Sequence, residues 1–347
     1  MADDITIDNG KTKGGSRLRI IIGYLIGLAC LIWVFHDIHF EKLLHQVGRI
    51  IWPWIFAGVF FDIASYASQG WRWKILLGPL GKMTSIKTTQ AIYVGLFTNE
   101  ILPLRVGEFV RSYLVSRWLK KDFMSILPSI IVERMQDGIW LALGIGLMAL
   151  LIRLPRQLAD AADILGVVVI GGIAIFAYLV IRSKRGISGD AVSSSSGPKA
   201  LRIIKSYLRK FAKGISEIGS AGSFYRSLLV SSLILIFQIL AFWFVMRGCD
   251  LNLSLWKGAA VMMIVHLGTT IPSAPSNIGT YQFFCVIGLM IFGIDKTTAT
   301  GFSVIVFIVL TVPLWVIGLI AINRTGMKLK DIRAEISRLF KSKLEFE

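Results

Sequence analysis

Long apolar runs are the feature that most restricts the fold of this 347-residue chain. Each approaches the roughly 20 residues that a helix needs to cross the hydrocarbon core of a bilayer. Backbone polar groups inside a bilayer must pair within a helix or a closed barrel, so runs of this length predict transmembrane helices. We therefore expect an all-α, polytopic membrane protein. The uninterrupted runs occupy residues 18–35, 50–70, 127–152, 164–182, 224–246 and 298–322.

Composition and cysteine usage agree with this expectation. Hydrophobic residues make up 54% of the chain and charged residues 17%, whereas soluble domains carry about 25% charged residues. The first run follows a polar tail, residues 1–17, predicted to be flexible and cytoplasmic, and no A-x-A-like cleavage site follows the run. We therefore predict a retained span. Cys30, Cys249 and Cys285 lie in or beside apolar runs without C-x-x-C spacing, so neither a disulfide nor a metal site is expected, and no cofactor.

Two further apolar regions, 88–119 and 257–292, are interrupted in the middle by proline and polar residues. The first half of each is about 14 residues, or about 21 Å of helix, which is shorter than the bilayer core. Proline removes a backbone donor and ends or kinks a helix. Each region is therefore interpreted as a re-entrant hairpin of two half-length helices; one long kinked span is the alternative. The residues that mark the breaks are Pro103, Gly107, Pro272, Pro275 and Gly279.

The distribution of Lys and Arg predicts the orientation. With a cytoplasmic N-terminus, and with both hairpins returning to their own side, 28 of the 38 Lys and Arg residues are cytoplasmic and seven lie opposite. This asymmetry follows the positive-inside rule, and it explains the net charge of +17 without a nucleic-acid partner. The chain is thus predicted to be a multi-pass protein of the plasma (cytoplasmic or inner) membrane with both termini cytoplasmic.

The order of predicted elements repeats: two spans, a hairpin and a span occur twice. Each half crosses the bilayer three times, so the second half is inverted relative to the first, a recurring transporter design. We predict about six spans and two hairpins in a single transmembrane domain, 18–323, followed by a basic cytoplasmic tail, 324–347. The predicted repeat halves are about 18–152 and 164–322.

One long loop, 183–223, separates the halves. It contains the linker SGDAVSSSSGP and then a basic segment in which Leu201, Ile204 and Leu208 recur at helical spacing. This pattern predicts an amphipathic helix that lies on an anionic leaflet or packs against the cytoplasmic face of the protein itself.

Several ionisable residues fall at membrane depth, where each costs at least about 2.5 kcal/mol and therefore usually faces protein or water. Arg105, Glu108 and Arg111 follow the first break at three-residue spacing, which places neighbours on one helix face. Arginine and a helix N-terminus both suit phosphate oxygens. The alternative is a salt-bridge network that only locks helices together. The candidate substrate-binding residues are Glu100, Arg105, Glu108, Arg111, Glu133, Arg134, Asp137, Asn277, Tyr281 and Gln282.

Three sequence blocks carry a family resemblance: NEILPLRVGEFVRSYLV, then IVERMQDGIWL, and later IPSAPSNIGTYQ. In this order they resemble the signature blocks of the lysylphosphatidylglycerol synthase transmembrane region, the flippase-like integral membrane family. The resemblance covers about residues 18–322. The chain departs from the family at PSAPSNIG, where relatives more often carry Pro-Gly-Gly-like turns. Larger relatives add a soluble aminoacyl-transferase domain, which we expect to be absent because only about 25 residues follow the last predicted span.

The resemblance implies a lipid flippase or transporter rather than an enzyme. Its substrate would be a phosphate-bearing lipid: an anionic or modified phospholipid, or a polyprenyl-phosphate-linked lipid. The expected partners are membrane lipids with anionic head groups, together with an enzyme of lipid modification. Two alternatives stay open: a membrane-embedded transferase acting on lipid-linked substrates, and a non-transporting scaffold that recruits an enzyme through the 183–223 loop.

Overall fold

The computed structural model describes residues 10–102, 106–151, 221–270 and 274–326, with five isolated positions between 167 and 178. The described residues form ten α-helices and one short 3-10 helix, so the described fold is all-helical, as predicted. The helices are α1 (Gly10–Phe35), α2 (Phe40–Gly48), α3 (Trp52–Leu77), α4 (Ser85–Ile101), α5 (Gly107–Leu119), α6 (Phe123–Leu151), α9 (Ala221–Gly248), α10 (Leu255–Gly268), η2 (Pro275–Asn277), α11 (Thr280–Ile291) and α12 (Lys296–Asn323).

Five of the six predicted uninterrupted spans correspond to long helices: α1, α3, α6, α9 and α12. The predicted span 164–182 and the 183–223 loop lie largely outside the described residues. By length and composition alone, Gly222–Gly248 and Lys296–Asn323 are apolar enough to cross a membrane, and a third span results if the bent α2–α3 pair counts as one. The six spans and the inverted repeat therefore stay predictions. Helix α2 was not predicted, because the sequence patterns indicated only a connection between the first two spans.

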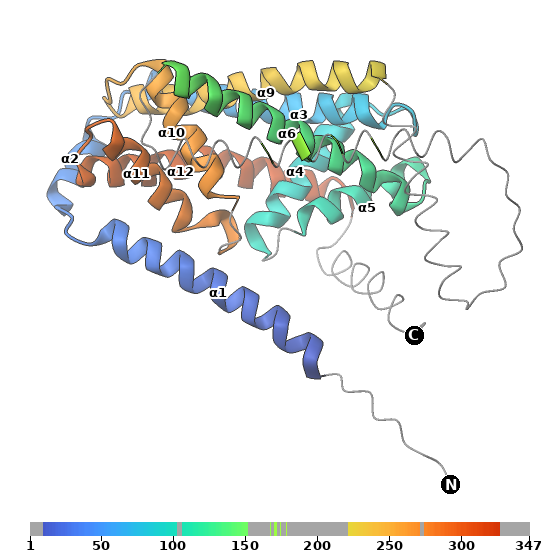
Figure 1. Cartoon of the computed structure of the whole chain (residues 1–347), viewed down its shortest axis with the longest axis horizontal. Helices are drawn as coiled ribbons and strands as arrows, with labels where there is room; N and C mark the ends of the chain where they lie inside the picture. Colours follow the sequence, from blue (N-terminus) through green and yellow to red (C-terminus); the bar gives the residue numbers. More distant parts are fainter. Residues whose placement is uncertain are drawn as a thin grey trace, which may run out of the picture.

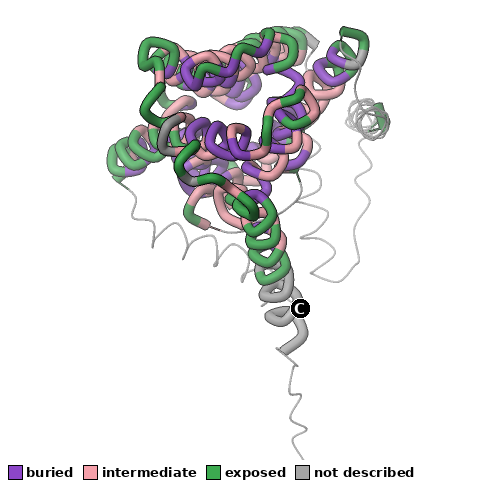
Figure 2. The backbone as a smooth tube through the Cα atoms, turned by 90° about the vertical axis from the view of Figure 1, so that its left-hand side faces the viewer, coloured by how far each residue is buried: buried purple, intermediate pink, exposed green. Residues whose placement is uncertain are grey.

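The helix body is built around α3 and α9, which lie side by side along most of their lengths with α6 next to them (Figure 1). Helices α4, α11 and α12 run along the other side of the body, and α4 and α12 both pack against α3. Helix α1 projects away from the body and contacts it mainly through α11. Figure 2 shows α1 largely exposed, while buried residues gather in the body. The exposed side chains of α1 are apolar, among them Leu25 and Leu28, as expected for a surface that faces lipid.

The first interrupted region folds into two separate helices that pack against each other, α4 and α5. A Cβ atom on Gly107 would lie 1.8 Å from the carbonyl oxygen of Gly95, so the two backbones approach closely only because position 107 is glycine. The Gly107 N–H donates to Asn99 Oδ1 at 2.7 Å, which satisfies one of the free donors at the start of α5. Pro103 and Arg105 lie outside the described residues. The two halves of this region thus pack against each other as separate helices, and their re-entrant position in a membrane stays a prediction.

The second interrupted region has the same plan: α10 and α11 pack against each other, and η2 lies in the break between them. Ser276 and Asn277 have positive φ angles of 58° and 53°, and Gly279 has a φ of 92°, a conformation that favours glycine. A Cβ on Gly279 would also lie 2.1 Å from the carbonyl oxygen of Gly27 in α1. Pro272 lies outside the described residues.

The two breaks meet in space. The Ser276 hydroxyl in η2 donates to the backbone carbonyl of Glu100, near the end of α4, at 3.1 Å. Residues 176 positions apart in the sequence are thus joined where both helical pairs are interrupted.

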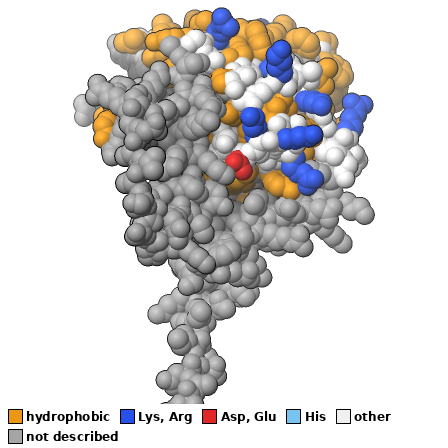
Figure 3. All heavy atoms as spheres, turned by 90° about the vertical axis from the view of Figure 1, so that its right-hand side faces the viewer, with side chains coloured by type: hydrophobic (Ala, Val, Ile, Leu, Met, Phe, Trp, Pro, Cys, Tyr) orange, Lys and Arg blue, Asp and Glu red, His pale blue; other side chains and the backbone are white. Residues whose placement is uncertain are grey.

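One end of the molecule is basic. Figure 3 shows Lys and Arg side chains gathered on the visible part of the end where α3 and α5 finish and α9 begins (Figure 1). This end is the one that the sequence analysis assigns to the cytoplasm, and the compartment that it faces stays a prediction. The exposed basic residues in the segments at this end are Lys74, Lys82, Lys87, Arg117, Lys120, Lys121 and Arg226.

Candidate functional site

Six charged side chains from α3, α5 and α6 are joined by ion pairs of alternating sign, some buried in the helix body and some partly exposed, and we call them the charged cluster. It consists of Arg111, Glu133, Arg72, Asp137, Arg134 and Glu108, in that spatial order. Its three arginines and three carboxylates cancel in formal charge. Five of the six are among the residues predicted from the sequence.

Glu133 lies between Arg111 and Arg72 in the charged cluster and is fully buried. Its two carboxylate oxygens accept from different arginines: Oε2 from Arg111 Nη2 at 2.7 Å and Oε1 from Arg72 Nη2 at 3.3 Å. Arg72 and Arg111 are themselves 2% and 4% exposed. Buried charges of this kind are tolerated when they are paired and hydrogen-bonded.

Neighbouring side chains hold the inner arginines in place. The Arg111 guanidinium lies 4.6 Å from the centroid of the Trp73 ring, a cation–π contact. Trp73 is fixed in turn, because its Nε1–H donates to Ser129 Oγ at 2.9 Å. Arg72 also donates to Ser231 Oγ at 3.1 Å, which ties α9 to the charged cluster.

The outer end of the charged cluster is open. Arg134 keeps 55% of its side chain exposed, and its two ion pairs are long: 3.3 Å to Glu108 Oε1 and 3.4 Å to Asp137 Oδ2. Asp137 also pairs with Arg72 Nη1. A recess of about 20 Å³, lined by Asn99, Glu108, Arg111 and Arg134 among others, lies at this end. It has room for about one water molecule.

Arg72 is the member of the charged cluster that the sequence reasoning missed. The predicted second span ended at residue 70, which assigned Arg72 to a cytoplasmic connection, whereas α3 continues to Leu77. The available signal was local: Arg72 lies between Trp71 and Trp73 and is followed by the apolar Ile75, Leu76 and Leu77, a pattern that favours continuation of the helix.

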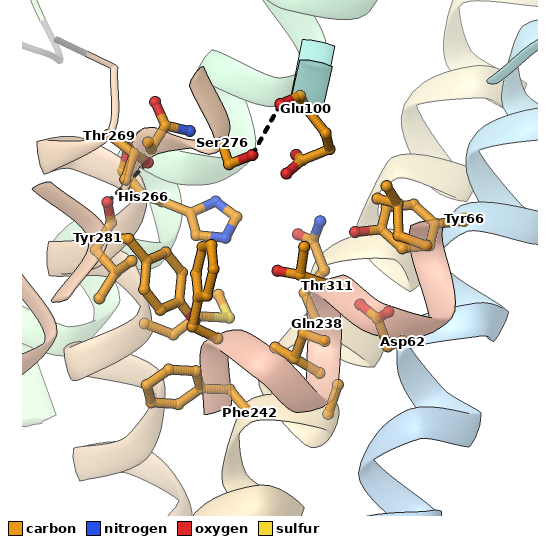
Figure 4. A pocket seen from close by; sticks show the side chains of 17 residues that line it. Asp62, Tyr66, Glu100, Gln238, Phe242, His266, Thr269, Ser276, Tyr281 and Thr311 are labelled. Atoms are coloured by element: carbon orange, nitrogen blue, oxygen red, sulfur yellow. Dashed lines mark hydrogen bonds between the residues drawn. The ribbon is translucent and has the colours of Figure 1, made fainter. Parts of the chain in front are cut away.

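The remaining predicted residues lie elsewhere, so the predicted site is divided in two. Glu100, Asn277 and Tyr281 line a cavity of about 220 Å³ between α3, α4, η2 and α9–α12, which we call the central cavity. None of the six residues of the charged cluster lines it. Gln282 has a local role, because its Oε1 accepts from the Gly279 N–H at 2.8 Å at the start of α11. Figure 4 shows the central cavity and the Ser276–Glu100 hydrogen bond at its edge.

Apolar helices, two interrupted helical pairs that meet, and paired charges inside the body define a multi-pass α-helical membrane protein. The chain belongs to the family described as lysylphosphatidylglycerol synthase TM region, whose sequence profile matches residues 20–318. The chain is also similar to the glycosyltransferase AglD of Haloferax volcanii, with 22% identity over 297 residues. That match covers 77% of this chain and 48% of the relative, so the chain spans about half the length of the curated relative.

Proposed function

We propose that this protein moves a phosphate-bearing lipid between the two leaflets of its membrane and catalyses no covalent chemistry. The observation that carries the proposal is the open end of the charged cluster. Arg134 is more than half exposed, and its ion pairs to described residues are long, so it can exchange a carboxylate for a lipid phosphate at little cost. A guanidinium binds phosphate oxygens through two parallel hydrogen bonds.

The other arginines of the cluster have a different role in this proposal. Arg72 and Arg111 already satisfy Glu133 and are almost completely buried. They position α3, α5 and α6 around Arg134 and do not touch the lipid, which reassigns Arg111 from phosphate binding to positioning. Glu108 and Asp137 orient Arg134 while no lipid is bound. Arg105, outside the described residues, remains a candidate phosphate ligand.

Lipid movement would use the two interrupted helical pairs. Broken helices that meet inside a bilayer are a recurrent device of alternating access, in which one bundle rocks against the other. In this chain the contact between the pairs is a hydrogen bond from Ser276 to the Glu100 carbonyl, which a small relative movement would break. The head group would cross along the polar interior while its acyl chains stay in the bilayer.

A flipping assay tests the proposal. The protein is reconstituted into vesicles that contain fluorescent phosphatidylglycerol or a fluorescent polyprenyl phosphate, and dithionite quenching reports the lipid in the outer leaflet. Arg134→Ala should slow movement by about 10- to 100-fold, because a hydrogen bond to a charged group contributes about 1.5–3 kcal/mol. Arg226→Ala is the matched control, since Arg226 is an exposed arginine on α9 outside the charged cluster. Wild-type vesicles that flip no faster than protein-free vesicles would contradict the proposal.

The name of the relative favours a second candidate, a membrane-embedded transferase acting on lipid-linked sugar. Purified protein would be incubated with radiolabelled nucleotide sugars and a lipid extract. Label that enters the lipid fraction, and is lost in Arg134→Ala, would support this second candidate. Absence of transfer, together with flipping by the wild type, would favour transport.

A further inference from the structure

The central cavity has the opposite electrical character to the charged cluster. Two carboxylates, Asp62 of α3 and Glu100 of α4, line its wall, and among the described residues that line it none is lysine or arginine. A lipid phosphate would be repelled there once either carboxylate is ionised. The central cavity therefore suits a cation, and it is a separate site from the one that we assign to the phosphate.

Asp62 is the unusual member of this wall. The residue is 6% exposed, and its Oδ2 atom is buried without a hydrogen-bond partner in the described structure. The buried carboxylate of Glu133, in contrast, has two guanidinium partners. A buried carboxylate without a partner is costly as an anion, so it is driven to take up a positive charge. Figure 4 shows the Asp62 side chain at the wall of the cavity.

The groups around Asp62 come from each helix that lines the central cavity. Tyr66 lies on α3, Glu100 on α4, His266 on α10 and Tyr281 on α11. Tyr93 on α4 is close enough to interact electrostatically with Asp62, and its hydroxyl is also buried without a hydrogen-bond partner in the described structure. Helices α9 and α12 contribute uncharged side chains, such as Gln238 and Thr311.

Three of these groups exchange protons readily, and they face one another across the central cavity. Figure 4 shows Asp62, Glu100 and His266 entering it from different sides. Glu100 lies next to the junction of the two breaks, since its backbone carbonyl accepts from Ser276 and its Oε2 from Trp315 Nε1 at 3.4 Å. Carboxylates and histidines arranged in this way inside a membrane form proton relays in pumps and transporters.

We propose that Asp62 is a proton-binding site that couples lipid movement to a proton gradient, with Glu100 and His266 passing the proton between Asp62 and the junction of the breaks. The proposal rests on the transport function proposed above. In one cycle the Asp62 carboxylate takes one proton from water on one side of the membrane, becomes the neutral acid, and returns that proton to water on the other side. Neutralising Asp62 removes the cost of its burial, which favours one arrangement of the surrounding helices.

A binding measurement tests the site independently of transport. Infrared difference spectra of the purified full-length protein, recorded between neutral and alkaline pH, where exposed carboxylates stay ionised, should contain the carbonyl band of a protonated carboxylic acid, and the band should shift in heavy water. Asp62→Asn should remove the part of this band that belongs to Asp62. Asp250→Asn should keep it, because Asp250 is exposed and its positive φ of 59° is readily adopted by asparagine. A band of unchanged intensity in Asp62→Asn would overturn the proposal.

A transport measurement tests the coupling. Vesicles with fluorescent phosphatidylglycerol receive a gradient of one pH unit while the membrane potential is clamped. One proton coupled to one lipid should shift the leaflet ratio by up to about tenfold. Asp62→Asn should abolish the shift, and Asp62→Glu, which restores a titratable group, should recover part of it. If Asp62→Asn does not yield folded protein, Asp62→Glu is measured in its place. An infrared band and a leaflet shift that both equal those of the wild type would then overturn the proposal.

The outcomes separate this proposal from the function on which it rests. A wild-type shift that persists in Asp62→Asn, or one that follows a sodium gradient instead of the pH gradient, overturns the proton site and leaves transport intact. Wild-type protein that moves no lipid contradicts the transport function, whereas the infrared band still supports or overturns proton binding at Asp62.

Discussion

Individual residues differ widely in how firmly the structure holds them. Glu133 is fully buried and neutralises two buried arginines, whereas Glu108 has one ion pair to a described residue, at 3.3 Å, and 28% of its side chain is exposed. Removing one partner of a buried ion pair leaves an uncompensated charge in the interior, and exposed pairs contribute little. The same chemical change should therefore have different effects at these two positions.

We expect Glu133→Gln to lower the free energy of unfolding by about 3–5 kcal/mol, because Arg72 and Arg111 would lose their shared carboxylate. Glu108→Gln, the matched control, should cost about 1 kcal/mol or less. Denaturant unfolding of the detergent-solubilised variants, followed by tryptophan fluorescence, measures both. Equal stability of the two variants would show that the charged cluster does not stabilise the fold.

At the scale of elements, the interrupted helical pairs depend on glycines at close backbone contacts. Gly107 allows α5 to approach α4, and Gly268 lets α10 lie against Phe284 of α11. The proline and polar residues near the breaks indicated from the sequence where these helices stop. The contact distances depend on which residues face each other after the chain turns, and only the fold gives them.

Gly107→Ala should separate α4 from α5, since the added Cβ would lie 1.8 Å from the Gly95 carbonyl oxygen. Overpacking of this kind costs about 1–3 kcal/mol. The loss is measured as a lower thermal unfolding temperature in detergent. Gly146→Ala is the control, because its added Cβ in α6 would meet no other described part of the protein within 4 Å, and it should unfold at or above the wild-type temperature. A Gly107→Ala protein as stable as Gly146→Ala would contradict the tight α4–α5 contact.

At the scale of the whole molecule, basic side chains and exposed apolar side chains lie in different parts of the protein. Lys and Arg gather at one end of the helix body (Figure 3), while α1 leaves the body with its apolar side chains exposed. Positive charge near the ends of membrane helices is typical of the cytoplasmic side. The orientation predicted from the sequence places the basic end there.

Cysteine labelling in intact cells checks this orientation. Lys82→Cys, in the α3–α4 connection at the basic end, should react with a membrane-impermeant maleimide only after the cells are permeabilised. Asn252→Cys, in the connection that follows α9, should react in intact cells. The native cysteines are replaced first: Cys249 and Cys285 are buried and Cys30 is partly exposed. The reverse labelling pattern would place the basic end outside.

The sequence by itself determined the class of protein, the extent of most helices and the types of residue in the charged cluster. The length of an apolar run, the position of a proline and the spacing of charged residues are local properties of the sequence. They can therefore be interpreted without knowledge of how distant segments pack. The tertiary structure decided the partners: Arg72 reaches Glu133 across 61 positions and Ser276 reaches Glu100 across 176. It also showed that the predicted site divides into a charged cluster and a separate acidic cavity around Asp62. Which charges meet depends on how distant helices pack, and periodicity within one helix contains no information about its neighbour.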